Sequence, residues 1–590
     1  MNSLKNKIFP FGARIKRALF FWYKEKTISQ GEIDKKLIYG LAPRKIPNSR
    51  QLKHLTKFLN PKEYLIIKIC LLLILINGVY LGIVFVRKHI QYSPKIGGTY
   101  IEGVVGYPQT INPLYATSRD IDSDLTRLIY SSLFVYDQNG RLVNDLVDNY
   151  TVSADYKEYT IKIKNNVRWQ DNDKLTADDI VFTFNLIQNP DFRSPLRSIF
   201  AGVDAQKIDD QTIKFTLAQP YAPFPELLTF GILSKNVWSN VSPSGATLNN
   251  LNLKPVGSGP YKFKSLVRST DGDLKEYHLV ADSNYYGSKP YIQNITFKFF
   301  VDYTQAIKAL NDNQIDGLSY LSLDSRGDVL AQNSLFFHEL VQPEIVSIFF
   351  NKDRNKILGD KDVRAALAQA LDKNQLIQDV FNGIYARQDG PIMTSNWAYD
   401  DQIKIYNYSP ADSLTVINKK PLSLTLTVVD ANANATVAQK IKSYWEQIGV
   451  KVNLKIVAGE EAANIIRNRD FEAIIYGESV GGDPDVYAFW HSSQIGSKGL
   501  NLAGYGNLDV DKLLADARAT TDISQRLNDY KKFQEIITGD LPVIWLYSPT
   551  YTYVQTKNVK GFNGTMAIQP ADRFASLASW YINTHKKITW

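Results

Sequence analysis

The feature that most constrains this chain is one apolar run, which begins at Leu65 and ends at Val86. It contains 22 residues and a single charge, Lys68. A helix needs about 20 mainly apolar residues to cross the hydrocarbon core of a bilayer. Lys68 lies one turn inside the run, where a long side chain can reach the headgroups. We therefore predict a transmembrane helix over residues 65–86, with a buried core helix as the alternative.

The charge around this run predicts its orientation. Residues 1–62 carry 15 Lys/Arg and three acidic residues, whereas the rest of the chain carries 53 Lys/Arg and 56 Asp/Glu. Basic flanks stay on the cytoplasmic side of a membrane. We expect residues 1–64 to form a basic cytoplasmic tail and residues after about 90 to lie outside the cell. Because the basic character is local to the tail, nucleic acid is not expected as a partner.

The apolar run does not resemble a cleaved signal peptide, whose apolar core has 7–15 residues and a small-residue cleavage site. Arg87, Lys88 and His89 follow the run directly. Ile67, Lys68 and Ile69 precede Cys70, so the small residues that precede a lipid-modified cysteine are missing. An uncleaved signal anchor is the expected form.

A short segment before the anchor has apolar residues at helical spacing. These residues are Leu52, Leu55, Phe58 and Leu59, and the basic Lys53 and Lys57 lie on other faces. The pattern is typical of an amphipathic helix on the inner leaflet. An ordinary solvated linker is the alternative.

Residues from 97 onward alternate strand and helix patterns. Tyr159, Ile161 and Ile163 alternate with polar residues and predict a half-buried strand. The stretch 435–448 has one apolar face and is followed by Gly449 as a helix end, then by a strand pattern from Val450. A length of 590 residues suggests two or three domains. The body is predicted to be α/β with more than one sheet.

Motifs of catalysis and metal binding are missing from the sequence. It has no GxxxxGK[ST] phosphate loop and no GxSxG elbow. Its six histidines are scattered, and its one cysteine, Cys70, lies in the apolar run. The segment 171–173 (DND) lacks the later ligands of a calcium loop and predicts a polar turn. We predict that the protein is not an enzyme and has no cofactor or metal. The alternative that folding brings two carboxylates together as a glycosidase pair stays open.

Several segments resemble, in the same order, those of the family-5 extracellular solute-binding proteins. This family includes the oligopeptide-, dipeptide- and nickel-binding receptors of ABC importers. The segments span most of 97–583 and are NPL at 112–114, LVDNYTVSADYKEYTIKIKNNVRWQDNDKLTADDIVFTF at 146–184, PVGSGPY at 255–261, VRAAL at 363–367, GPI at 390–392, DVDKLL at 509–514 and LPVI at 541–544. Each segment alone is weak evidence for the family, but the occurrence of all of them in the same order makes the resemblance specific.

The resemblance implies a two-lobed α/β periplasmic-binding-protein fold of type II, of the large form. Residues 97–139, 255–345 and 545–590 would form lobe I, and residues 140–254 would form an inserted subdomain of it. Residues 346–544 would form lobe II. The two lobes would close on a ligand about a hinge. An ABC permease, and through it ATPase subunits, would be the protein partners.

The resemblance also suggests residues that contact the ligand. The cleft segment of lobe II matches 476–485 (YGESVGGDPD), where peptide-binding relatives often carry an aspartate that pairs with the ligand's α-ammonium. That position is Val480 here, a departure from the pattern. The candidate ligand-binding residues are Glu478, Asp483, Asp485 and Trp397, with Tyr107, Tyr130 and Tyr505 as weaker candidates.

These observations predict a membrane-anchored peptide receptor of an ABC importer, with its binding domain extracellular or periplasmic. Two alternatives stay open. The same fold could bind a nickel chelate, a sugar oligomer or an opine, although only His491 lies near the cleft segment as a nickel ligand. The long tail 1–64 also suggests a sensory or scaffolding role.

Overall fold

The computed structural model describes residues 31, 34–35, 59–330, 332–430 and 433–588. The chain divides into two compact units, residues 1–93 with 586–590 and residues 94–585, which are described separately. The predicted amphipathic segment falls outside the described residues, except for Leu59.

The first unit contains helix α5, Pro61–His89, which includes the predicted span. Its stretch Pro61–Phe85 has a mean hydropathy of 2.4, and its most apolar window has no residue buried inside the protein. By length and composition this helix can cross a membrane. Strand β1, Ile90–Pro94, follows it and pairs with β21, Thr584–Ile588.

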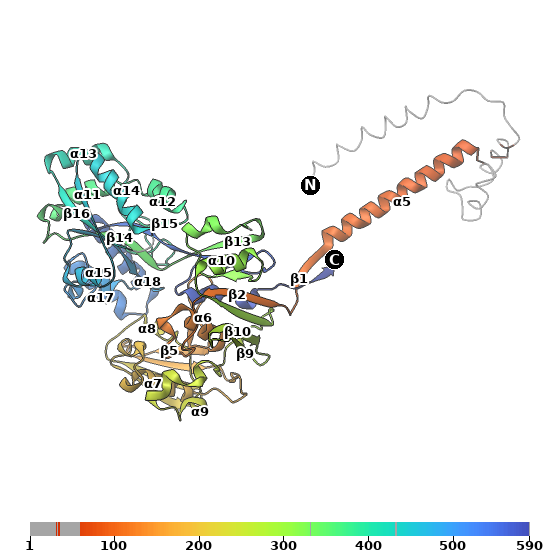
Figure 1. The fold of residues 1–590 in the computed structure, drawn as a ribbon, viewed down its shortest axis with the longest axis horizontal. Helices are drawn as coiled ribbons and strands as arrows, with labels where there is room; N and C mark the ends of the chain where they lie inside the picture. Colours follow the sequence, from red (N-terminus) through yellow and green to blue (C-terminus); the bar gives the residue numbers. More distant parts are fainter. Residues whose placement is uncertain (1–30, 32–33, 36–58, 331, 431–432, 589–590) are drawn as a thin grey trace, which may run out of the picture. The chain divides into compact units, whose positions relative to one another are not determined.

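The second unit is built from helices and sheets (Figure 1). It contains three larger sheets and two large hydrophobic cores. We call residues 94–341 and 550–585 the first lobe, and residues 344–548 the second lobe. Each lobe is built around one of the two large cores, and a smaller core lies under helix α10, Tyr303–Asn311, of the first lobe.

The first lobe has a seven-stranded sheet of order β13-β20-β12-β2-β11-β10-β9. Strand β2 pairs in parallel with β11 and β12, and the remaining neighbours pair antiparallel. The strands are β2 (Thr99–Val105), β9 (Tyr261–Arg268), β10 (Leu274–Ala281), β11 (Asn294–Phe300), β12 (Gly317–Leu318), β13 (Leu335–Val341) and β20 (Thr550–Thr556). Helix α6, Asp120–Ile129, buries Leu125, Leu128 and Ile129 in the large core of this lobe.

A buried ion cluster ties distant parts of the first lobe together. Arg573 is fully buried and donates to both oxygens of Asp124 at 2.6 Å. It also donates to Glu102 on β2 at 3.0 and 3.1 Å. Removing one member of such a cluster leaves an uncompensated buried charge, so the cluster fixes the C-terminal part of the chain against β2 and α6.

A smaller four-stranded sheet, of order β5-β6-β8-β7, belongs to the same lobe. Its elements, with the hairpin and helices around it, are β3 (Phe134–Tyr136), β4 (Leu142–Asn144), β5 (Val147–Val152), β6 (Glu158–Ile163), α7 (Ala177–Gln188), β7 (Val203–Asp209), β8 (Thr212–Leu217), α8 (Phe224–Leu227) and α9 (Lys235–Trp238). The predicted alternation is confirmed, since Tyr159, Ile161 and Ile163 are all buried. Thr176 and Asp179 form a capping box at the start of α7.

The second lobe has a six-stranded sheet of order β15-β19-β14-β18-β16-β17. Its elements are β14 (Glu344–Phe350), α11 (Lys361–Gln369), α12 (Lys373–Phe381), β15 (Ala386–Arg387), α13 (Pro410–Lys419), β16 (Ser423–Val429), α14 (Asn434–Gln447), β17 (Lys451–Val457), α15 (Gly459–Asn468), β18 (Ala473–Ser479), α16 (Tyr487–Trp490), α17 (Leu508–Ala519), α18 (Ile523–Asp540) and β19 (Val543–Ser548). Helices α11 to α14 cover one side, and α15, α17 and α18 cover the other (Figure 1). Helix α14 and strand β17 follow the pattern predicted for 435–456.

The chain passes between the lobes twice. It leaves β13 at Val341 and enters β14 at Glu344, and it leaves β19 at Ser548 and enters β20 at Thr550. A hydrogen bond of 3.0 Å from the Gln342 amide to the Pro549 carbonyl joins the two crossings. The boundary expected after residue 544 falls inside β19, because the buried apolar run 543–547 has no break before Pro549.

Candidate ligand-binding cleft

A cavity of about 750 Å³ lies between the lobes. The first lobe contributes residues within segments 139–142, 222–226 and 565–566, together with Tyr150 and Tyr159. The second lobe contributes residues within 393–397, 481–483 and 521–526. This volume falls within the range of small-molecule sites in proteins. The cavity is the place where a ligand would contact both lobes at once.

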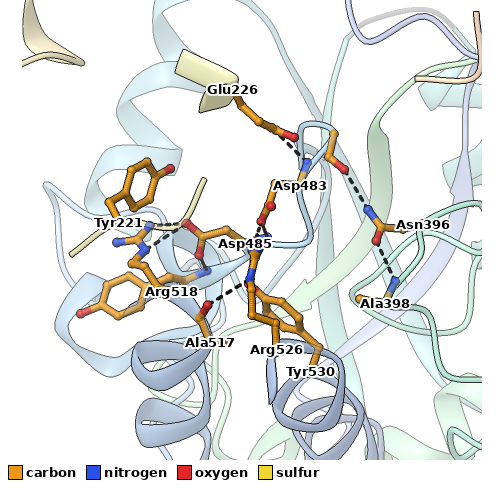
Figure 2. Close-up of polar contacts among 12 residues, drawn as sticks. Tyr221, Glu226, Asn396, Ala398, Asp483, Asp485, Ala517, Arg518, Arg526 and Tyr530 are labelled. Atoms are coloured by element: carbon orange, nitrogen blue, oxygen red, sulfur yellow. Dashed lines mark hydrogen bonds and ion pairs between the residues drawn. The ribbon is translucent and has the colours of Figure 1, made fainter. Parts of the chain in front are cut away.

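The loop after β18 forms one wall of the cavity and lies close to the first lobe. Gly481 has a φ of +72°, a backbone conformation that favours glycine. At Gly482, an added Cβ would lie 2.8 Å from Cε1 of Tyr136 in the first lobe. The side-chain Nδ2 of Asn396 donates to the Gly482 carbonyl at 3.0 Å (Figure 2). Two glycines therefore permit this close approach of the lobes.

Asp483 and Arg526 form an ion pair in the cavity wall. Arg526, near the start of α18, donates to Asp483, and its side chain is only 5% exposed. It also donates to the Ala517 carbonyl at 3.1 Å and lies over the ring of Trp397, 5.4 Å from its centroid. The two opposite charges compensate each other, which a buried charge requires.

Asp485 and Arg518 form a second ion pair behind that wall. Arg518 donates twice to one oxygen of Asp485, at 2.8 and 2.9 Å. Its guanidinium lies 4.1 Å from the ring centroid of Tyr487 and 5.2 Å from that of Tyr221 in the first lobe. The Arg518 carbonyl also accepts a 2.8 Å hydrogen bond from the Ala222 amide, so this region joins the two lobes. Figure 2 shows Arg518 between Asp485 and Tyr221.

Glu226, on the short helix α8, contacts the second lobe from the opposite side. Its Oε2 accepts hydrogen bonds from the Asp483 amide and from the Tyr136 hydroxyl, each at 3.0 Å. Desolvation, followed by repulsion from Asp483, raises the pKa of Glu226 to about 7, although these hydrogen bonds and Arg526 act in the other direction. No motif in the sequence pointed to Glu226, because its position depends on how the lobes meet.

Two of the predicted site residues line this cavity, Asp483 and Trp397. Trp397 is 44% exposed, and its ring packs edge-on against Tyr530. Asp485 is not part of the cavity wall and is held by Arg518. Val480 packs against the core of the second lobe. The structure thus brings two of the four main candidates into the cavity.

Glu478 is buried in β18 and is not among the cavity residues. Its Oε1 has no hydrogen-bond partner within the described part of the chain, and burial raises the pKa of its carboxyl well above the usual range. A carboxyl group in this setting is favoured in its neutral form.

The three weaker candidates lie apart from the cavity. Tyr130 is buried and borders a separate cavity of about 250 Å³ in the first lobe. Tyr107 is 56% exposed. Tyr505 donates to Asp540 at 2.7 Å. The nearby His491 stacks on Tyr487 and accepts from the Ser493 amide. Within the described residues, no three His, Cys, Asp or Glu side chains form a group that could hold a metal ion.

Residues 141–499 match the bacterial extracellular solute-binding proteins, family 5, in the middle region of that family. This chain belongs to that family. The family is a class of substrate-binding transport proteins rather than a class of enzymes. This membership confirms the resemblance that the ordered sequence segments indicated.

Relatives of this family-5 protein share its sequence over most of their length. It is 27% identical over 515 residues to the oligopeptide-binding protein AppA of Bacillus subtilis, covering 83% of this chain and 92% of the relative. It is 26% identical over 494 residues to the dipeptide-binding protein of Escherichia coli, covering 78% and 90% of the two chains.

Solved structures confirm the predicted α/β periplasmic-binding-protein fold. The ABC transporter substrate-binding protein CtaP of Listeria monocytogenes matches with a TM-score of 0.71 at 26% identity, over 82% of this chain and 99% of the other. Bacillus subtilis AppA in complex with a nonapeptide matches with a TM-score of 0.61 at 26% identity, over 83% and 100% of the chains.

Proposed function

We propose that this protein is the extracellular substrate-binding subunit of an ABC importer, which binds peptides between its lobes and delivers them to a permease. The observation that carries the proposal is the cavity of about 750 Å³ whose walls come from both lobes. The peptide-binding relatives named above, one of them solved with a nonapeptide, give the ligand class.

The chemistry of the cavity walls suits a peptide. Trp397 and Tyr150 offer aromatic surface, and Ser395, Asn396 and Thr521 offer groups that form hydrogen bonds. Ligand sites commonly combine an apolar lining with a few polar groups that fix orientation. An extended peptide can bind mainly through its backbone, while the surrounding space tolerates varied side chains.

Ligand binding would act through the contacts between the lobes. Glu226 meets the Asp483 amide, and Ala222 meets the Arg518 carbonyl. A ligand that contacts both walls stabilises the arrangement in which these bonds form, since it binds that arrangement more tightly than an open one. The permease can then recognise the closed form.

The membrane anchor is part of the same proposal. Helix α5 would hold the protein in the bilayer as a single span, with the basic tail 1–64 in the cytoplasm and the binding lobes outside. The apolar stretch Pro61–Phe85 supports this placement. The protein should remain in the membrane pellet after alkaline carbonate extraction, and a variant lacking residues 1–93 should be released into the soluble fraction.

Native mass spectrometry of the full chain purified in mild detergent tests the ligand class. We expect bound peptides of mixed sequence to co-purify and to be identified after release. A single non-peptide species would contradict the peptide assignment. A protein that carries no ligand and gains no thermal stability from a peptide library would contradict the import function.

A further inference from the structure

Arg518 of the second lobe contacts the first lobe at a place outside the interlobe cavity (Figure 2). Its guanidinium lies 5.2 Å from the ring centroid of Tyr221, which is within the range of a cation–π interaction. Neither side chain belongs to the wall of the cavity. A change at this contact therefore acts on the lobes without removing a group that lines the cavity.

The second lobe holds the Arg518 guanidinium in place by itself. Asp485, whose side chain is 7% exposed, accepts two hydrogen bonds from it at 2.8 and 2.9 Å. The ring of Tyr487 adds a second cation–π contact at 4.1 Å. Because both partners belong to the same lobe, the guanidinium keeps its counter-charge when the lobes separate. Opening then leaves no unpaired buried charge and breaks only the contacts between the lobes.

The first lobe presents Tyr221 on a restrained segment between β8 and α8. Residues 220–225 read PYAPFP, and each of the three prolines fixes its own φ. The Tyr221 carbonyl accepts from the Tyr159 hydroxyl at 2.9 Å and from the Phe224 amide at 3.2 Å. A segment held in this way loses little conformational entropy when it meets a partner.

A backbone hydrogen bond accompanies the ring contact. Arg518 is the last residue but one of α17, and the final carbonyls of a helix have no partner within the helix. The Ala222 amide of the first lobe donates to the Arg518 carbonyl at 2.8 Å. Neighbouring residues of the first lobe thus engage both the side chain and the backbone of Arg518.

We infer that Arg518 sets how long a bound peptide stays between the lobes, through its contacts with Tyr221 and Ala222. We call these three residues the latch. Arg518 is a positioning residue, since it holds the lobes together and does not line the cavity. The latch forms only once the lobes have closed, so it slows ligand dissociation and leaves association unchanged. This inference rests on the proposed peptide function for its ligand.

The kinetic test uses the full chain in mild detergent and a peptide hit selected by thermal shift from a random tri- to hexapeptide library. Stopped-flow tryptophan fluorescence gives the association and dissociation rate constants. Tyr221→Leu removes the ring and should raise the dissociation rate constant about fivefold, the size of one cation–π contact. The association rate constant should stay within about twofold of the wild-type value.

Two variants show whether the ring itself is responsible. Tyr221→Phe keeps the ring and removes only the hydroxyl, so it should restore the wild-type dissociation rate. Tyr444→Leu removes a half-buried ring that contacts Tyr408 within the second lobe, and it should also behave as wild type. The melting temperature of each ligand-free variant reports whether the fold is intact.

A double-mutant cycle tests the partner of the ring. Arg518→Gln combined with Asp485→Asn removes the cation together with its counter-charge, so no unpaired carboxylate is left buried. This pair of substitutions should raise the dissociation rate constant by about the same factor as Tyr221→Leu. Adding Tyr221→Leu to it should produce no further change, because interacting residues are not additive.

A second measurement needs no ligand. The Asp483 amide donates to Glu226 across the lobes at 3.0 Å, so its hydrogen exchange reports closure at a site remote in sequence from the latch. Hydrogen–deuterium exchange followed by mass spectrometry is carried out on the ligand-free full chain. Tyr221→Leu should take up deuterium at Asp483 faster than the wild type, and Tyr221→Phe should not.

The outcomes separate the latch from the proposed function. Peptide binding with equal dissociation rates in Tyr221→Leu and wild type overturns the latch and leaves the peptide function standing. An equally large increase in Tyr221→Phe, or a further increase when Tyr221→Leu is added to the double variant, overturns it as well. Failure of the wild type to bind any library peptide overturns the proposed function. In that case unchanged exchange at Asp483 in Tyr221→Leu overturns the latch independently.

Discussion

The carboxylate of Glu226 in the first lobe accepts a 3.0 Å hydrogen bond from the backbone amide of Asp483 in the second lobe. The same oxygen accepts from the hydroxyl of Tyr136. The acidic side chain that completes the cavity wall is therefore also a direct link between the lobes (Figure 2). Ligand binding and lobe closure should depend on the same group.

Loss of Arg526 should destabilise the second lobe. Arg526→Met leaves the Asp483 carboxylate without its partner in a position only 12% exposed. Breaking a buried pair in this way costs about 3–5 kcal/mol. Arg354→Met provides a matched control, since its pair with Asp470 is more than half exposed and is worth about 0–1 kcal/mol. Urea unfolding followed by tryptophan fluorescence measures the difference, and equal effects of the two variants would argue against a structural role of the buried pair.

A methyl group at Gly482 should hinder closure. Gly482→Ala places its Cβ 2.8 Å from the Tyr136 ring, which its hydrogen bond to Glu226 holds in place. We expect weaker peptide binding, with a change in melting temperature of no more than a few degrees. Gly539→Ala should leave binding unchanged, because a Cβ added there would meet no atom within 4 Å beyond its chain neighbours and its own helix backbone. Small-angle scattering with saturating peptide should show a larger radius of gyration for Gly482→Ala than for wild type, and identical curves would contradict this role of Gly482.

The aromatic wall should contribute to affinity. Trp397 is 44% exposed and lines the cavity, so a bound ligand would cover part of its ring. Trp397→Ala should weaken peptide binding by about 1 kcal/mol, roughly fivefold, from lost apolar burial. Tyr107→Ala, outside the cavity and 56% exposed, should leave the dissociation constant unchanged. If Tyr107→Ala weakened binding more than Trp397→Ala, the ligand would lie elsewhere in the protein.

Local patterns in the sequence predicted much of the fold. The alternation around Tyr159 and the apolar face of α14 followed from side-chain periodicity, which depends only on neighbouring residues. The residue at which the second lobe ends was harder to predict, because residues 543–547 are all buried and form one apolar run across the expected boundary. Only the sheet pairing assigns all of β19 to the second lobe.

Only part of the cavity lining could be predicted from the sequence, for a physical reason. Asp483 and Trp397 lie in segments that the family resemblance marked, and both line the cavity. Glu226 and Arg526 take part because α8 and α18 converge on the loop after β18, across 257 residues of sequence in the case of Glu226 and Asp483. Glu478 shows the converse, since an acidic residue in the marked segment has its side chain buried away from the cavity.

The central claim, that peptides bind in the cavity between the lobes, is tested most directly by photo-crosslinking. A peptide hit from the library, carrying a benzophenone side chain, is bound to the full chain in detergent, irradiated and mapped by mass spectrometry. The account predicts adducts within segments 139–142, 222–226, 393–397, 481–483, 521–526 and 565–566, and their loss when unlabelled peptide is added in excess. Adducts that map elsewhere on the protein and that unlabelled peptide still competes away would contradict it.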